Sequence, residues 1–144
     1  MRSLSKRVPM LFMLTVVALL GGHGVAAAQT ARVGREFELK VGRVVTLDGG
    51  GLQVRLARVA SDSRCPVGVN CVWAGNAEVV FEVGARGRRG RTTLTLNTNA
   101  SPERPGEGRS GRYTLKLVGL APRPRGDGKI AAGRYTATLL VAKE

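Results

Sequence analysis

The only two cysteines of this 144-residue chain, Cys65 and Cys71, are separated by five residues. A cysteine pair can form a structural disulfide, a redox-active disulfide or part of a metal site. Redox motifs typically place two residues between the cysteines, and a metal site needs further ligands. The one histidine, His23, lies in an N-terminal segment that we expect to be removed. We therefore favour a structural disulfide between Cys65 and Cys71.

The segment between the cysteines must fold back on itself. Six extended residue steps span about 20 Å, whereas bonded cysteines have Cα atoms roughly 4.4–6.8 Å apart. Pro66 and Gly68 lie in this segment and permit the turn. Closing a loop of about seven residues stabilises a fold by roughly 2.4 kcal/mol, through the lost freedom of the unfolded chain.

Catalytic groups are scarce outside the N-terminal segment. Without His23, neither a Ser-His-Asp nor a Cys-His mechanism can be assembled. The ten acidic residues are dispersed, and a paired-carboxylate hydrolase would need two of them to converge. We expect no enzyme activity, no cofactor and no metal site.

Three residues around the cysteines are candidates for binding: Asp62, Arg64 and Trp73. Asp62 could pair with Arg64, or it could accept backbone N–H groups and fix the turn, and we favour these structural roles over a binding role. Trp73 is the only tryptophan. We expect it to pack on the disulfide or the adjacent sheet, with an exposed contact role as the alternative.

Residues 62–75 read Asp-Ser-Arg-Cys-Pro-Val-Gly-Val-Asn-Cys-Val-Trp-Ala-Gly. This segment resembles the motif D-S-R-C-P-x-x-V-x-C-x-W-A-G of small, uncharacterised secreted or periplasmic bacterial proteins. The resemblance is strong over about 14 residues. It implies export and a disulfide loop, and it implies no catalytic activity.

Residues 1–28 have the organisation of a secretory signal peptide. Arg2, Lys6 and Arg7 precede an apolar stretch from Val8 to Gly22, and Ala26-Ala27-Ala28 provides a cleavage site. A retained membrane anchor is the alternative, but about 15 apolar residues fall short of the ~20 that a spanning helix needs. We expect cleavage, no membrane span afterwards, a periplasmic or secreted location, and a single domain over residues 29–144.

The remaining sequence predicts β-strands. Apolar and polar residues alternate in the runs that precede and follow the turn at 48–51, which predicts a hairpin. Further strands are expected at 77–83, 92–96, 112–120 and 134–141, with a long surface loop at 97–111. About seven strands indicate an all-β fold: an antiparallel β-sandwich, immunoglobulin-like or similar, with a small β-barrel as the alternative.

The domain is strongly basic. Without Arg2, Lys6 and Arg7, twenty basic residues face ten acidic ones, a net charge of about +10. Such a charge favours anionic partners, although arginine outnumbers lysine 18 to 5 and could reflect genomic base composition. The candidate contacts lie in two loops and would form one patch if these shared an end of the sandwich: Arg86, Arg88, Arg89, Arg123 and Arg125.

These observations favour an exported, non-catalytic binding or structural module of the bacterial envelope. Its partner would be an anionic envelope component or a protein. Nucleic acid is not expected, because the basic loops contain no aromatic residues that could stack on bases. The alternative is a secreted inhibitor of an exogenous hydrolase, which would present the loop between Cys65 and Cys71, with Pro66 to Asn70 as the inserted segment.

Overall fold

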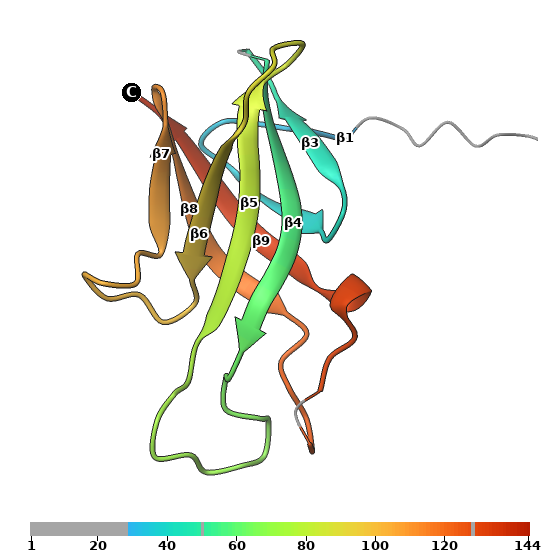
Figure 1. Cartoon of the computed structure of the whole chain (residues 1–144), viewed down its shortest axis with the longest axis vertical. Coiled ribbons are helices and arrows are strands. Elements are labelled where there is room, and N and C mark those ends of the chain that lie inside the picture. The colour runs from blue at the N-terminus through green and yellow to red at the C-terminus, as the bar shows by residue number, and fades with distance from the viewer. Residues whose placement is uncertain (1–28, 50, 128) are drawn as a thin grey trace, which may run out of the picture.

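The computed structural model describes residues 29–144 except Gly50 and Gly128, so the expected signal peptide, residues 1–28, lies outside the described residues. The described chain forms a sandwich of two β-sheets (Figure 1). This all-β sandwich is the architecture that the alternating sequence runs predict. Among the described residues, no helix is long and apolar enough to cross a membrane.

The first sheet has five strands in the order β1-β3-β4-β5-β6. β1 runs parallel to β3, and every other neighbouring pair is antiparallel. The hairpin of β3 and β4 confirms the one predicted around the glycine-rich turn at 48–51. The strand bounds are Gln29–Ala31 (β1), Val44–Leu47 (β3), Leu52–Asp62 (β4), Ala77–Ala85 (β5) and Thr92–Asn97 (β6).

The second sheet has four antiparallel strands in the order β2-β9-β8-β7. A short 3-10 helix, Ala132–Arg134, leads into its strand β9. The strand bounds are Glu36–Lys40 (β2), Glu107–Ser110 (β7), Tyr113–Ala121 (β8) and Thr136–Lys143 (β9).

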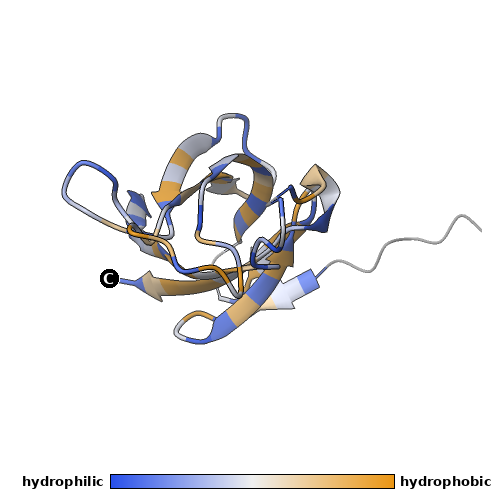
Figure 2. Ribbon diagram, turned by 90° about the horizontal axis from the view of Figure 1, so that it is seen from below, coloured by the Kyte–Doolittle hydropathy of each residue, from blue (hydrophilic) through white to orange (hydrophobic). Residues whose placement is uncertain are grey.

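The hydrophobic core lies between the two sheets. In the longer strands, alternate residues point inward, as the bands of hydropathy along them show (Figure 2). Val54 and Phe81 from the first sheet and Leu139 from the second are completely buried there. The core therefore consists of the apolar positions that alternate in the sequence.

The described chain has nine strands rather than about seven, because the short strand β1 was not expected, one expected run divides in two, and an expected loop contains a strand. The apolar run 35–47 divides at Gly42, whose φ of 78° favours glycine, and its halves join different sheets. β7 lies inside the segment that we expected to be a loop. Its sequence, Glu-Gly-Arg-Ser, has no apolar alternation because β7 is an edge strand with little side-chain burial.

All but one of the connections between strands gather at the two ends of the sandwich; the short β2–β3 turn lies beside the middle of β4. The cysteine end carries the β4–β5, β6–β7 and β8–β9 connections (Figure 1). The opposite end carries the β1–β2, β3–β4, β5–β6 and β7–β8 connections. The two basic loops, residues 86–91 and 122–129, therefore lie at opposite ends. They do not form one patch, because β5 ends at one pole of the sandwich and β8 at the other.

Candidate binding site at the cysteine loop

The cysteine loop, residues 63–76, extends the hairpin of β4 and β5 beyond the sandwich (Figure 1). Its stem continues the ladder: the Ser63 N–H donates to the Asn76 carbonyl at 2.7 Å, and the Cys65 N–H donates to the Ala74 carbonyl at 3.1 Å. Gly75 allows this close approach, since a Cβ there would lie 1.9 Å from the Ser63 carbonyl oxygen. The loop is therefore a structured projection.

A disulfide between Cys65 and Cys71 closes the projection, as the sequence predicts, with Cα atoms 5.9 Å apart. Between them the chain reverses in a turn in which the Val69 N–H donates to the Pro66 carbonyl at 3.2 Å. Gly68, at the third position of this turn, has a φ of 81°, the conformation for which turns of this kind select glycine.

The end of the projection is apolar. Trp73 is 82% exposed and Val72 is 90% exposed, while Val67 and Val69 are about half exposed. We call these four residues the apolar tip. The expectation that Trp73 packs on the disulfide or the sheet is wrong. The stem carries Trp73 past the last paired residues of β4 and β5, Asp62 and Ala77, and so beyond the core.

Arg64 attaches the stem to the second sheet. Its guanidinium donates to both carboxylate oxygens of Asp62, at 2.8 and 2.7 Å, and the side chains of this pair are only 10% and 7% exposed. It also donates to the carbonyls of Leu120 and Pro122. The expected pairing is thus present, and the Arg64 N–H also donates to Asp62, so both structural roles foreseen for Asp62 are realised.

Tyr135, the residue just before β9, completes this network, since its hydroxyl donates to Asp62 at 3.1 Å. Burial alone raises the pKa of Asp62, but the hydrogen bonds from Arg64 and Tyr135 and the guanidinium charge outweigh it. The pKa of Asp62 therefore lies below its ordinary value. Burial and the negative charge of Asp62 raise the pKa of Tyr135. The network favours an ionised Asp62 and a protonated Tyr135.

A second network holds the other side of the stem. The buried Asn76 side chain donates to the Asn97 side-chain oxygen at 2.7 Å, and Asn97 donates to the Pro105 carbonyl. The Asn76 side-chain oxygen accepts from the Asn99 N–H at 3.0 Å. These bonds fix the stem to the β6–β7 connection, so the cysteine loop is attached to the sandwich on both sides.

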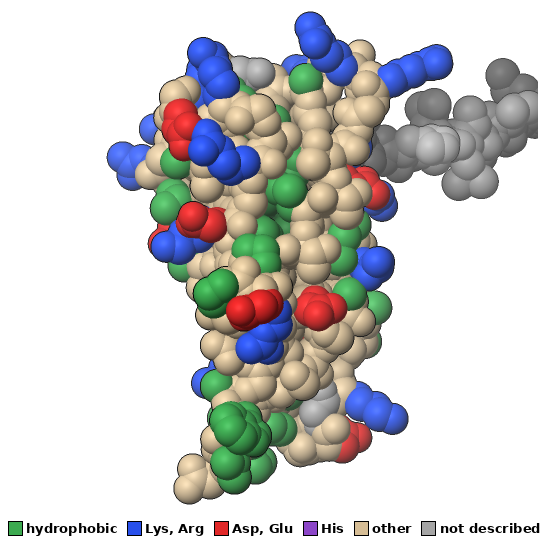
Figure 3. All heavy atoms as spheres, turned by 60° about the vertical axis from the view of Figure 1, so that its left-hand side comes forward, with side chains coloured by type: hydrophobic (Ala, Val, Ile, Leu, Met, Phe, Trp, Pro, Cys, Tyr) green, Lys and Arg blue, Asp and Glu red, His purple; other side chains and the backbone are tan. Residues whose placement is uncertain are grey.

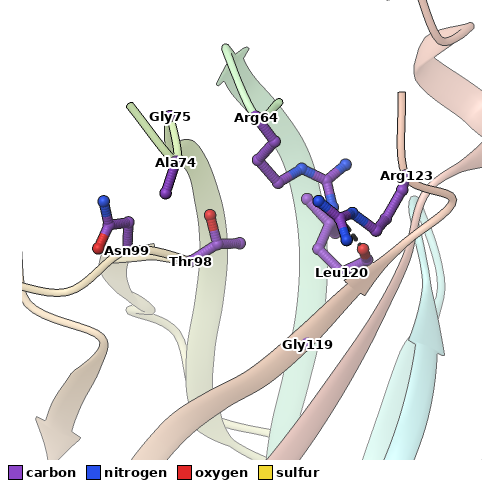
Figure 4. Close-up of a pocket in the computed structure, with 8 residues that line it drawn as sticks. All are labelled: Arg64, Ala74, Gly75, Thr98, Asn99, Gly119, Leu120 and Arg123. Atoms are coloured by element: carbon purple, nitrogen blue, oxygen red, sulfur yellow. Dashed lines mark hydrogen bonds between the residues drawn. The ribbon is translucent and has the colours of Figure 1, made fainter. Parts of the chain in front are cut away.

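An open hollow of about 260 Å³ lies between the two networks (Figure 4). The side chain of Arg64 crosses one side of it beside Arg123, and Thr98 and Asn99 face them from the β6–β7 connection. Its lining residues are Arg64, Ala74, Gly75, Thr98, Asn99, Gly119, Leu120 and Arg123. Since none of these is acidic, the hollow provides no pair of carboxylates.

The basic candidates divide between the two ends. Arg123 lies at the cysteine end, where its guanidinium donates to the Cys65 carbonyl at 3.3 Å, and Arg125 follows in the same connection. Arg86, Arg88 and Arg89 lie in the β5–β6 turn at the opposite end. The structure therefore brings Asp62, Arg64 and Arg123 together and separates them from the other three arginines.

Sequence reasoning missed the partners that hold the stem. The Leu120 and Pro122 carbonyls lie 56 and 58 residues from Arg64 along the chain. Asn76 and Asn97 carry no local signal beyond being amides near strand ends. Within residues 29–144, apart from the two undescribed glycines, no cluster of three or more acidic, histidine or cysteine side chains could hold a metal ion.

No protein-family model, curated protein or solved structure matches the chain. The functional proposal therefore depends on the residues and geometry of the chain itself.

Proposed function

We propose that this chain is an exported, non-catalytic domain that binds a partner protein through the apolar tip of its cysteine loop. The observation that carries this proposal is the exposure of Trp73 beside three exposed or half-exposed valines on one projection. Aromatic side chains in contact patches contribute much of the affinity of protein interfaces. A tip of this shape would enter an apolar pocket of the partner.

The attachment of the cysteine loop supports a binding role. The disulfide, the Arg64 network and the Asn76 network hold the loop in one conformation before any partner arrives. A preorganised loop loses little conformational entropy on binding, so more of the contact energy becomes affinity.

Export is part of the proposal and is supported by two features. Residues 1–28 have the charge and apolar pattern of a signal peptide. The disulfide suits an oxidising compartment, such as the bacterial periplasm or the extracellular medium.

The residue types of the site support a non-catalytic role. Residues 29–144 contain no histidine. Arg64 and Asp62, the most buried ionisable pair of the site, already satisfy one another and two backbone carbonyls. Groups so completely occupied are suited to holding the loop in place rather than to transferring protons.

The test uses Trp73 as a reporter and as a target. The full chain would be used to capture binding proteins from an envelope extract, and each captured protein would be purified and titrated against the parent, Trp73→Ala and Val118→Ala. Val118 is the matched control, since it is an exposed valine on β8, away from the tip. We expect Trp73→Ala to weaken binding by about 30-fold or more, as for a hot-spot residue.

Val118→Ala should change the affinity less than about threefold. Because Trp73 is the sole tryptophan, its fluorescence emission should shift to shorter wavelength when the partner covers it. Equal loss of affinity in both variants, or an unshifted emission at saturation, would count against the proposal.

A hydrolase inhibitor is a second candidate, favoured by the convex form of the loop. A rigid, disulfide-closed projection fits the shape of an enzyme cleft, and the segment from Pro66 to Asn70 contains its turn. Assays against secreted proteases and lysozymes test this candidate. Inhibition at micromolar concentration that is lost in Val67→Ser/Val69→Ser would support it. Absence of inhibition of every enzyme assayed would rule it out.

A further inference from the structure

The end of the sandwich opposite the cysteine loop concentrates arginine. The β1–β2, β5–β6 and β7–β8 connections meet at this end, and basic side chains crowd around it (Figure 3). All of these arginines are exposed. We call them the arginine end, which consists of Arg32, Arg35, Arg86, Arg88, Arg89, Arg91 and Arg112.

Most of this charge is not neutralised within the described chain. Arg91 pairs with Glu82 at 3.7 Å, and the other six arginines have no carboxylate partner within 4.0 Å among the described residues. Three acidic residues lie at the same end. Asp48 accepts from the Val33 N–H, Glu144 pairs with Arg109, and Glu36 is exposed at the start of β2. The arginine end therefore carries a net positive charge.

We propose that the arginine end binds a phosphate-bearing anionic membrane surface. Its charges lie on separate turn tips rather than around a cavity, so they match an extended array of anions better than one small anion. A guanidinium can donate two parallel hydrogen bonds to a phosphate group. This site is separate from the apolar tip and does not depend on the protein-binding proposal.

The composition of the turns argues against single-stranded nucleic acid as the polyanion. Their sequences, Arg-Val-Gly-Arg at 32–35, Arg-Gly-Arg-Arg-Gly-Arg at 86–91 and Gly-Arg at 111–112, contain no aromatic residue. Proteins that bind single-stranded nucleic acid place aromatic side chains among the basic ones, to stack on the bases. Membrane phosphates require only charge and hydrogen-bond donors, which these turns provide.

The experiment measures co-sedimentation with vesicles at low salt. One set of vesicles contains phosphatidylcholine with one third phosphatidylglycerol, and the other contains phosphatidylcholine alone. The test variant is Arg86→Gln/Arg88→Gln/Arg89→Gln. The matched control, Arg123→Gln/Arg125→Gln/Lys129→Gln, removes the same charge from the cysteine end. The three test residues lie in an exposed turn, and folding of each variant is checked by circular dichroism.

We expect the parent to bind the anionic vesicles and not the neutral ones. Each arginine near an anionic surface strengthens binding by about fivefold, so the test variant should bind about a hundredfold more weakly. The control variant should lose far less. Millimolar inorganic phosphate should not compete, since a single small anion cannot occupy the whole arginine end.

Four results would overturn the proposal: equal losses in the two variants, competition by inorganic phosphate, absence of binding to anionic vesicles, or tighter binding to a DNA oligonucleotide that also requires Arg86, Arg88 and Arg89. Trp73 fluorescence separates this proposal from the previous one. Its emission should not change on vesicle binding, whereas a shift to shorter wavelength would place the apolar tip in the membrane.

Discussion

Arg64 joins the end of β4 to a segment that is more than 50 residues distant in the sequence. It pairs with Asp62 at the end of β4 and donates to carbonyls at the end of β8 and in the following connection. Tyr135, before β9, donates to the same Asp62. One guanidinium therefore joins the root of the cysteine loop to the second sheet, which makes its removal a direct test of how the loop is held.

We predict that Arg64→Leu lowers the free energy of unfolding by about 3–5 kcal/mol. The substitution would leave Asp62 buried without its charge partner, and the cost of breaking a buried pair comes from the ion that remains. Urea unfolding measures this change. Arg55→Leu is the control, because its pair with Glu82 is more exposed and should cost less than about 1 kcal/mol. Similar losses in both variants would contradict the prediction.

The pH dependence of stability should follow the same network. The folded-state pKa of Asp62 is lowered, so its stabilisation is present above the unfolded-state pKa of about 3.9 and is lost as the pH falls through the folded value. The pKa of Tyr135 is raised, so its stabilisation is present below the unfolded-state pKa of about 10 and is lost as the pH rises through the folded value.

Urea unfolding at a series of pH values tests both the loss of stability in acid and the loss of stability in alkali. Asp62→Asn should flatten the fall in stability below about pH 4, and Tyr135→Phe should flatten the fall above about pH 10. If the free energy of unfolding of Asp62→Asn falls as steeply in acid as that of the parent, other carboxylates control the acid sensitivity.

For individual residues, the sequence predicted a contact correctly where the two residues are close together in the chain. Asp62 and Arg64 are two residues apart, and their pairing could be foreseen. Trp73 could not be placed correctly, because tryptophan favours burial on average and nothing in its neighbours reveals that the stem projects from the sandwich. The buried amides Asn76 and Asn97 are 21 residues apart and meet only in the folded chain.

At the scale of elements, the stem of the cysteine loop depends on one glycine. We predict that Gly75→Ala destabilises the fold by more than about 4 kcal/mol, because the added Cβ would overlap the Ser63 carbonyl and force the stem apart. Gly68→Ala is the matched control. Its φ is also positive, but nothing lies within 4 Å of its would-be Cβ, so it should cost only about 1–2 kcal/mol.

Thermal and urea unfolding of the two glycine variants give the comparison. Equal destabilisation would mean that the left-handed conformation, rather than the close approach at Gly75, controls the stability of the loop.

The disulfide should contribute a smaller and separable amount. We predict that Cys65→Ser/Cys71→Ser lowers the free energy of unfolding by about 2 kcal/mol, since the loop it closes is short. The fold should persist, because the stem hydrogen bonds and both side-chain networks remain. Far-ultraviolet circular dichroism and urea unfolding measure the two effects, and loss of the β spectrum would contradict the prediction.

The strand pattern was predictable where one face is buried and the other exposed. The alternating run at 52–56 predicted the start of β4, because each inward residue there is buried. β7 escaped prediction because an edge strand of polar residues has no such alternation. The partition of 35–47 between two sheets depends on Gly42 and on pairing with β9, which a local pattern cannot reveal.

For the whole molecule, the edges of the two sheets determine whether copies associate. β2 forms one edge of the second sheet and exposes Glu36, Glu38 and Lys40, and β7 forms its other edge with Glu107 and Arg109 exposed. In the first sheet, the edge strand β1 has only three residues, and the other edge strand, β6, is covered by β7 of the second sheet, whose Gly108 lies against Leu94. Charged and short edge strands discourage pairing between molecules.

We therefore predict a monomer in sedimentation velocity at concentrations of about 100 μM, a range in which exposed apolar edges typically associate. Glu36→Val/Glu38→Val, which removes two charges from the edge of β2, should shift the protein toward oligomers. A parent protein that dimerises, with no further change in the variant, would show that another surface controls association.

The length of β4 has a consequence for geometry. This strand runs the full height of the sandwich over 11 residues, about 35 Å at the usual rise per residue. A molecule bound to a bilayer through the arginine end would therefore hold Trp73 well above the lipid headgroups, at a fixed distance. The distance of the apolar tip from the membrane would be set by the length of β4, whereas a flexible linker would allow that distance to vary.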